Sequence, residues 1–130
     1  LMYPCIYNIY MVSRMQNKTQ TQINSNQNQK IFSLKDIIEN DELVKQLKKE
    51  FGYFRCKRNI LNGDGSIGFV LIDDSEQVLL ITLAMDYVSI CSLYYEHSEC
   101  RIFSFEDFED LDKIKVVKVE NGILSVLQPW

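Results

Sequence analysis

The sequence contains one histidine, five glycines and four cysteines among its 130 residues, and these shortages restrict the chemistry that it can support. No G-x-S-x-G turn is present to hold a serine nucleophile, and the single histidine, His97, stands in a predicted turn beside cysteines. Gly63 and Gly65 lie between two predicted strands and Gly68 lies in the second of them, whereas the glycines of a phosphate-binding loop precede a helix. We therefore predict that the protein has no catalytic residue and is not an enzyme.

Cysteine is too sparse and too irregularly spaced to form a disulfide framework; the four residues are Cys5, Cys56, Cys91 and Cys100. Cys91, His97 and Cys100 are residue types that bind zinc, but they lack the paired C-x-x-C spacing of a structural zinc site. We predict free, reduced thiols, no bound metal and no cofactor, in a cytoplasmic protein.

The first residues, LMYPCIYNIYMV, form an apolar run that has no charged segment before it and no small-residue cleavage site after it. The run is too short to span a bilayer, so we expect no membrane partner. The chain begins with Leu1 rather than methionine, which leaves three alternatives: a truncated N-terminus, translation from a non-AUG codon, or a native start at Met11 or Met15.

Residues 16–30 contain one apolar residue, Ile23, and are rich in asparagine and glutamine. Such a segment cannot bury enough surface to offset the entropy of ordering it, so residues 1–30 are predicted to be a flexible leader. Residues 31–130 are predicted to form a single α+β domain. The leader contributes +3 to the net charge of −4, so the domain carries −7, which disfavours sequence-independent binding of nucleic acid.

A helix is predicted at the start of the domain. Ser33 and Asp36 resemble a capping box, with an acid in place of the usual Glu or Gln. Asn40 interrupts the apolar face, which leaves two alternatives: one bent helix over 34–51, or a short turn followed by a helix over 41–51. The apolar residues at helical spacing are Leu34, Ile37, Ile38, Leu43, Val44, Leu47 and Phe51.

The region 53–95 alternates apolar runs with turn-forming segments, which is typical of an antiparallel meander. Beyond it we predict a turn at 97–99, a helical turn over 105–111 capped by Ser104, and a hairpin that pairs 113–120 with 123–127. The fold class is therefore α+β, with an N-terminal helix on a mostly antiparallel meander sheet of five to six strands. The predicted meander strands are 53–61, 66–73, 77–85 and 88–95, with a short strand at 101–103.

The strand predicted over 77–85 is apolar on both faces apart from Thr82, which is typical of a central strand covered on both sides. The predicted helix can cover one side only. Three candidates remain for the other side: the 105–111 segment, a second subunit and a protein partner.

The leading hypothesis is a small non-enzymatic protein-binding module, of the accessory, inhibitor or immunity type, that acts through its sheet or its acidic face. Tyrosine is enriched at binding hot spots, and complementary charge mainly guides the encounter of two proteins. A protein partner is expected, with a homo-oligomer as a further alternative. The candidate binding residues are three tyrosines and four acids: Tyr53, Tyr94, Tyr95, Glu106, Asp107, Glu109 and Asp110.

Two other hypotheses compete with this one. The first is a nucleic-acid-associated protein, with Arg55 and Lys57 on one face of the first meander strand. The second is a small enzyme or ligand-binding domain with a pocket between the helix and the sheet. The basic patch of the first alternative consists of Lys45, Lys48, Lys49, Arg55, Lys57 and Arg58.

Overall fold

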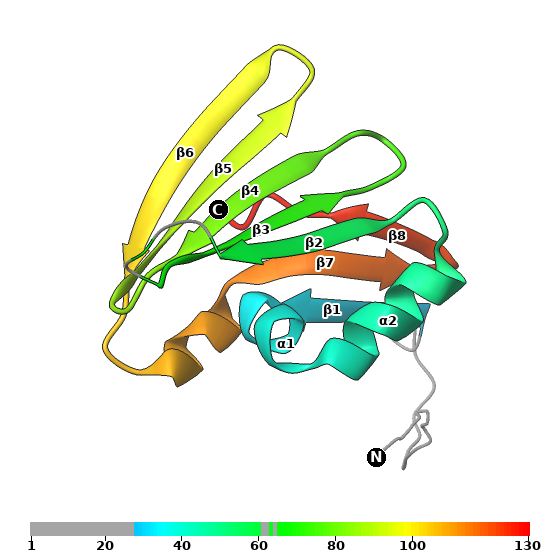
Figure 1. Cartoon of the computed structure of the whole chain (residues 1–130). Coiled ribbons are helices and arrows are strands. Elements are labelled where there is room, and N and C mark those ends of the chain that lie inside the picture. The colour runs from blue at the N-terminus through cyan, green and yellow to red at the C-terminus, as the bar shows by residue number, and fades with distance from the viewer. Residues whose placement is uncertain (1–27, 61–62, 64) are drawn as a thin grey trace.

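The computed structural model describes residues 28–60, residue 63 and residues 65–130 (Figure 1). Most of the predicted leader lies outside the described residues, and with it the alternative starts Met11 and Met15. Gln29 and Lys30, the end of that leader, belong to the first strand, β1 (Gln29–Ser33). The strand β1 therefore begins two residues before the predicted start of the domain at residue 31.

Two helices replace the single bent helix that was one of the predicted alternatives: α1 (Leu34–Glu39) and α2 (Asp41–Glu50). The predicted capping box is confirmed, because Ser33 Oγ accepts a hydrogen bond from the Asp36 N–H at 3.1 Å and Asp36 Oδ2 accepts one from the Ser33 N–H at 3.0 Å. Asn40 starts α2, since its Oδ1 accepts a hydrogen bond from the Leu43 N–H at 3.0 Å. Each helix thus begins at a side-chain cap.

The predicted meander is confirmed as a five-stranded antiparallel sheet in the order β2-β3-β4-β5-β6. Its last turn lies at Tyr95 and Glu96 rather than at 97–99, so β6 extends over eight residues. Tyr95 takes a positive φ of 55° to make this turn. The strands are β2 (Arg55–Ile60), β3 (Ile67–Ile72), β4 (Val78–Leu83), β5 (Tyr87–Tyr94) and β6 (His97–Ser104).

The remaining strands form a second, three-stranded antiparallel sheet in the order β1-β7-β8. The predicted final hairpin is β7 (Lys115–Glu120) and β8 (Ile123–Val126), joined through Asn121 and Gly122, both at positive φ. β1 joins its edge, with Gln29 opposite Glu120. The α+β class and the antiparallel pairing are confirmed, while the strands divide between two sheets.

The predicted helical turn is the 3₁₀ helix η2 (Phe108–Lys113), which Asp107 caps in place of Ser104. Figure 1 shows the three-stranded sheet and the helices on one side of the five-stranded sheet. Both sheets and the helices α1, α2 and η2 contribute to a single apolar core, with Leu34, Leu79 and Leu124 among its buried residues. The opposite face of the five-stranded sheet is not part of that core.

Candidate functional site

The outward face of the five-stranded sheet carries aliphatic side chains. In a strand, successive side chains point to opposite faces, so the buried Leu71, Leu79 and Ile90 mark the inward face. The strand register then places the residues between them on the outward face, where Val70 lies opposite Leu80 and Ile72 opposite Val78. We call this surface the open face; its aliphatic residues are Val70, Ile72, Val78, Leu80, Leu93 and Ile102.

No residue of the open face belongs to the apolar core of the described chain or packs against it. Leu80 is 40% exposed and Ile102 is 69% exposed. The 105–111 segment, one of the predicted covers, lies elsewhere: Phe108 and Leu111 pack in the core, and the neighbouring Asp112 accepts a hydrogen bond from Ser33 Oγ at 2.8 Å. Within the described residues, the second side of β4 is therefore open to solvent.

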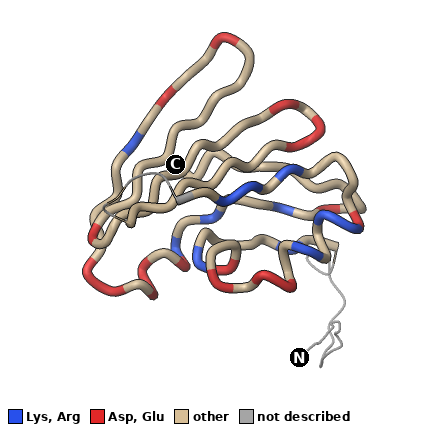
Figure 2. Tube along the Cα trace, viewed as in Figure 1, with Lys and Arg blue, Asp and Glu red and all other residues tan. Residues whose placement is uncertain are grey.

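A cationic margin borders the open face. Arg55 and Lys57 on the edge strand β2 lie in the same cross-strand rows as Ile72 and Val70, and both are exposed. Figure 2 shows several Lys and Arg positions along the backbone of β2 and α2. The surface thus combines an aliphatic centre with positive charge at one edge, which suits a partner with an apolar patch beside carboxylates.

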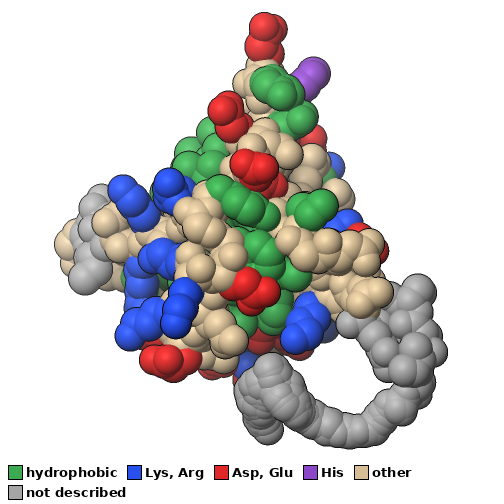
Figure 3. All heavy atoms as spheres, turned by 90° about the vertical axis from the view of Figure 1, so that its right-hand side faces the viewer, with side chains coloured by type: hydrophobic (Ala, Val, Ile, Leu, Met, Phe, Trp, Pro, Cys, Tyr) green, Lys and Arg blue, Asp and Glu red, His purple; other side chains and the backbone are tan. Residues whose placement is uncertain are grey.

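The β5–β6 hairpin projects beyond the rest of the sheet (Figure 1). At its tip the rings of Tyr94 and Tyr95 lie 4.3 Å apart, and Tyr95 is 78% exposed. A side-chain hydrogen bond with Tyr95 raises the pKa of Tyr94. Figure 3 shows hydrophobic side chains, acidic side chains and the single histidine gathered at this narrow tip. Two predicted binding tyrosines therefore lie together on a protruding element.

Cys91 and Cys100 form a disulfide across the β5–β6 hairpin, which corrects the prediction of free, reduced thiols at these positions. They are nine residues apart, and the turn at Tyr95 and Glu96 places them directly opposite each other. Cys56 is a buried free thiol, and burial raises its pKa. Cys5 lies outside the described residues.

Tyr53, the third predicted binding tyrosine, lies half-buried between elements of the fold. Its hydroxyl accepts a hydrogen bond from the Leu124 N–H at 3.0 Å and donates one to the Leu124 carbonyl at 3.4 Å. These bonds join the chain segment before β2 to β8. Tyr53 therefore has a structural role, and it does not lie with Tyr94 and Tyr95 at the hairpin tip.

We expect Tyr53→Phe to lower the free energy of unfolding by about 1 kcal/mol, because it removes the hydroxyl that pairs with Leu124. Urea denaturation followed by circular dichroism measures the change. Tyr87→Phe is the matched control, since it removes the same group from an exposed ring and should leave stability unchanged. Equal effects of the two substitutions would contradict the structural role of Tyr53.

The acidic residues lie far from the tyrosines of the hairpin tip. They follow β6 at its other end, and eight residues of extended chain separate the two groups by roughly 25 Å. Several are used locally: Asp107 caps η2, Glu109 lies 3.7 Å from Lys35 Nζ, and Asp110 lies 3.9 Å from Lys113 Nζ. Glu106 is exposed. The predicted sheet surface and acidic surface are thus two separate regions.

The predicted basic patch divides between the two faces of β2. Arg55 and Lys57 border the open face, while Arg58 points to the inward side, where its guanidinium carbon lies 5.7 Å from the centre of the Phe69 ring. Lys48 is engaged as well, because its Nζ donates a hydrogen bond to the Cys56 carbonyl at 3.1 Å. Cations nevertheless gather on one side of the molecule in Figure 3.

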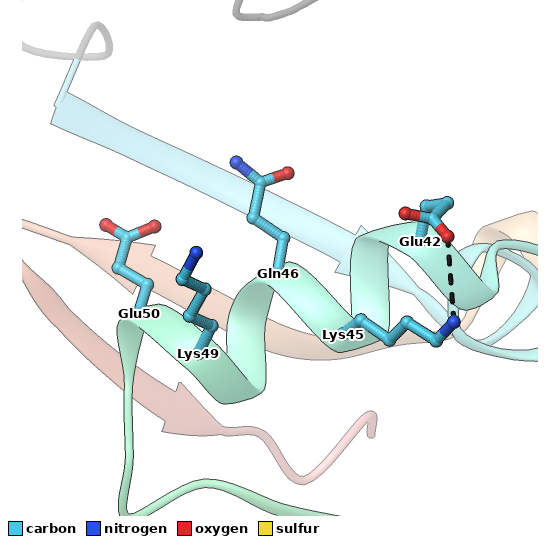
Figure 4. Close-up of a pocket in the computed structure, with 5 residues that line it drawn as sticks. All are labelled: Glu42, Lys45, Gln46, Lys49 and Glu50. Carbon is cyan, nitrogen blue, oxygen red and sulfur yellow. Dashed lines mark ion pairs between the residues drawn. The ribbon is translucent and has the colours of Figure 1, made fainter.

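A hollow of about 260 Å³ lies between α2 and β2, where a helix–sheet pocket was predicted as an alternative site. It is lined by Ile37, Asp41, Val44, Lys45, Lys48, Cys56, Arg58 and Phe69. A second hollow, of about 650 Å³, is lined by polar side chains of α2 alone, with Lys45 3.7 Å from Glu42 (Figure 4). That second hollow is a solvated helix face, and all the residues that line it are charged or polar.

Comparisons with known proteins identify no relative of this chain. No protein-family model matches the chain, and searches among curated proteins and among solved structures find no match either. Within the described residues, no three or more His, Cys, Asp and Glu side chains are grouped so as to hold a metal ion. None of the helices in that part of the chain combines the length and apolar character needed to cross a bilayer.

Proposed function

We propose that the protein is a small protein-binding module whose docking surface is the open face of the five-stranded sheet. The observation that carries this proposal is the set of six aliphatic side chains that point away from the core. An apolar surface of this kind gains free energy when a partner removes it from water, at about 25 cal/mol per Å². An accessory or inhibitor protein is the corresponding biological role.

The chemistry of the surface defines the partner. The centre, around Leu80 and Val70, requires an apolar counterpart, and the cations Arg55 and Lys57 favour carboxylates beside it. Charges at the margin of an interface mainly raise the association rate, whereas a buried apolar centre slows dissociation. The proposed partner is therefore a protein with an apolar patch bordered by acidic residues.

We expect Leu80→Glu to weaken partner binding at least tenfold, because it places a carboxylate in the apolar centre of the interface. The experiment is a tagged pull-down from native lysate, identification by mass spectrometry, and titration of the purified partner. Since Leu80 is 40% exposed, the stability of the variant should change little.

Ile123→Glu is the matched control, because Ile123 is a 60% exposed aliphatic residue on β8, in the other sheet. It should bind the partner as the unmodified protein does. Loss of binding in both variants, or in neither, would contradict the placement of the docking surface. A partner that is nucleic acid, released by Lys45→Glu and Arg58→Glu but retained by Leu80→Glu, would favour the basic patch instead.

A further inference from the structure

Among the described residues, β6 forms a free edge of the five-stranded sheet. It is the last strand of the order β2-β3-β4-β5-β6, and its eight residues pair with β5 without a register shift. All of them except Phe103 are exposed. An edge strand of this length presents a row of unpaired N–H and C=O groups, and natural proteins usually block such a row with charged side chains, especially lysine, with proline or with a bulge. The sequence of β6, HSECRIFS, contains neither lysine nor proline, and its two charged side chains, Glu99 and Arg101, pair with each other.

The disulfide identifies which backbone groups of β6 point outward. The Cα atoms of Cys91 and Cys100 lie 3.9 Å apart, which is the close spacing of a pair that exchanges no backbone hydrogen bonds. The N–H and C=O of Cys100 therefore point away from β5, towards the free edge. The same holds for every second residue, which includes Ser98 and Ile102.

Charges on β6 restrict how a second copy of the strand can pair with it. Glu99 and Arg101 lie on the same face, and Arg101 Nη2 lies 2.9 Å from Glu99 Oε2. In such a pair the two strands are related by a two-fold axis perpendicular to the sheet, and the corresponding side chains of both copies point to the same side of the joined sheet. The possible alignments therefore differ only in the residue on which the axis is centred. Centred on Cys100, the alignment places Glu99 opposite Arg101 of the second copy, and the reverse.

The neighbouring alignments are repulsive. Centring the axis on Glu99 places two glutamates opposite each other, and centring it on Arg101 places two arginines opposite each other. Alignments centred on Ser98 or Ile102 also preserve side-chain facing, but only the alignment centred on Cys100 places Glu99 directly opposite Arg101. Arg101 is also held in place, because its guanidinium carbon lies 5.0 Å from the centre of the Trp130 ring.

We propose that β6 binds a second copy of this chain as an antiparallel strand pair centred on Cys100, which joins two five-stranded sheets into one continuous sheet. Each dimer then contains two Glu99–Arg101 pairs between subunits. The contact uses the edge of the sheet and leaves the open face exposed, so it is independent of the binding function proposed above.

The test is a charge-swap experiment on the full-length chain by sedimentation equilibrium, up to about 0.1 mM protein, where micromolar dissociation constants are visible. The unmodified protein should form dimers. Glu99→Arg and Arg101→Glu should each weaken self-association at least tenfold, because each makes all four facing charges alike. The double variant, Glu99→Arg with Arg101→Glu, should dimerise again, and the two single variants should form a heterodimer when mixed.

Lys57→Glu, on the opposite edge strand, is the control and should dimerise normally. Formation of the heterodimer also shows that both single variants are folded. Dimerisation of the double variant shows in the same way that a chain with both substitutions is folded. An unmodified protein that stays monomeric, or single variants that dimerise as well as it does, would overturn the proposal.

A cross-link tests the alignment itself. Cys91→Ser leaves Cys100 with a free thiol at the proposed two-fold axis, so addition of a mild oxidant should produce a covalent dimer joined through Cys100. Cys100→Ser is the matched control, because it leaves the free thiol of Cys91 on β5, one strand away from the edge. Equal yields of covalent dimer from the two variants would contradict the alignment.

Discussion

Asp73→Ala is expected to lower the free energy of unfolding by about 3 kcal/mol, because it leaves three backbone donors without their acceptor. Asp73 is 7% exposed and follows β3. Its Oδ1 accepts hydrogen bonds from the N–H groups of Ser75 at 2.9 Å and Gln77 at 3.0 Å. Its Oδ2 accepts one from the Val126 N–H at 2.8 Å. One carboxylate thus holds the β3–β4 turn and joins it to β8 in the other sheet.

Urea denaturation of Asp73→Ala beside Asp74→Ala measures this effect. Asp74 is the neighbouring exposed acid, and its removal should change stability by less than about 0.5 kcal/mol. Asp73→Asn should be intermediate, since an amide has one acceptor oxygen and can keep either the turn or the link to β8. Equal stability of the two alanine variants would contradict the role given to Asp73.

Reduction of the Cys91–Cys100 disulfide should loosen the β5–β6 hairpin and leave the rest of the sheet unchanged. A disulfide that closes a loop of this size lowers the entropy of the unfolded chain, which stabilises the folded state by about 2–3 kcal/mol. Because the hairpin projects from the rest of the protein, we expect this stabilisation to be lost in the hairpin alone. Hydrogen–deuterium exchange of amides between residues 91 and 100 should accelerate at least tenfold with a phosphine reductant, while β3 exchanges at its original rate.

The control for reduction is the variant with both Cys91→Ser and Cys100→Ser, whose exchange should be fast and indifferent to the reductant. If the reductant accelerates amide exchange in the unmodified protein no more than in this variant, the stability of the hairpin does not depend on the disulfide. An equal acceleration throughout β3 would show instead that the hairpin is not a separate unit of stability.

Local patterns were sufficient to predict much of the fold. The Ser33–Asp36 box, the interruption at Asn40 and the Asn121-Gly122 turn are encoded by residues close together in the chain, and each is confirmed. β1 was missed because it is five residues long and its partner β7 lies about ninety residues further on. The division of the strands into two sheets depends on this distant pairing, which the periodicity of apolar residues along the sequence does not reveal.

The site was predictable in outline. The two apolar faces of the 77–85 segment indicated that the sheet has a second surface to cover, but the outward residues follow only from the strand register. The disulfide does not follow from local patterns, because Tyr95 and Glu96 are not typical turn residues and His97-Ser98-Glu99 resembles a turn more closely. Only the turn at Tyr95 and Glu96 places Cys91 directly opposite Cys100.

The open face can be tested most directly with a photo-crosslinking amino acid at position 80 and, as a control, at position 123. Irradiated in native lysate, the probe at position 80 should attach to one partner protein through an apolar segment bordered by acids, and the probe at position 123 should not. Attachment of the position-80 probe to residues 1–27 of the same chain would contradict the proposal, because the sheet would then be covered from within. Equal attachment from both positions would contradict it as well.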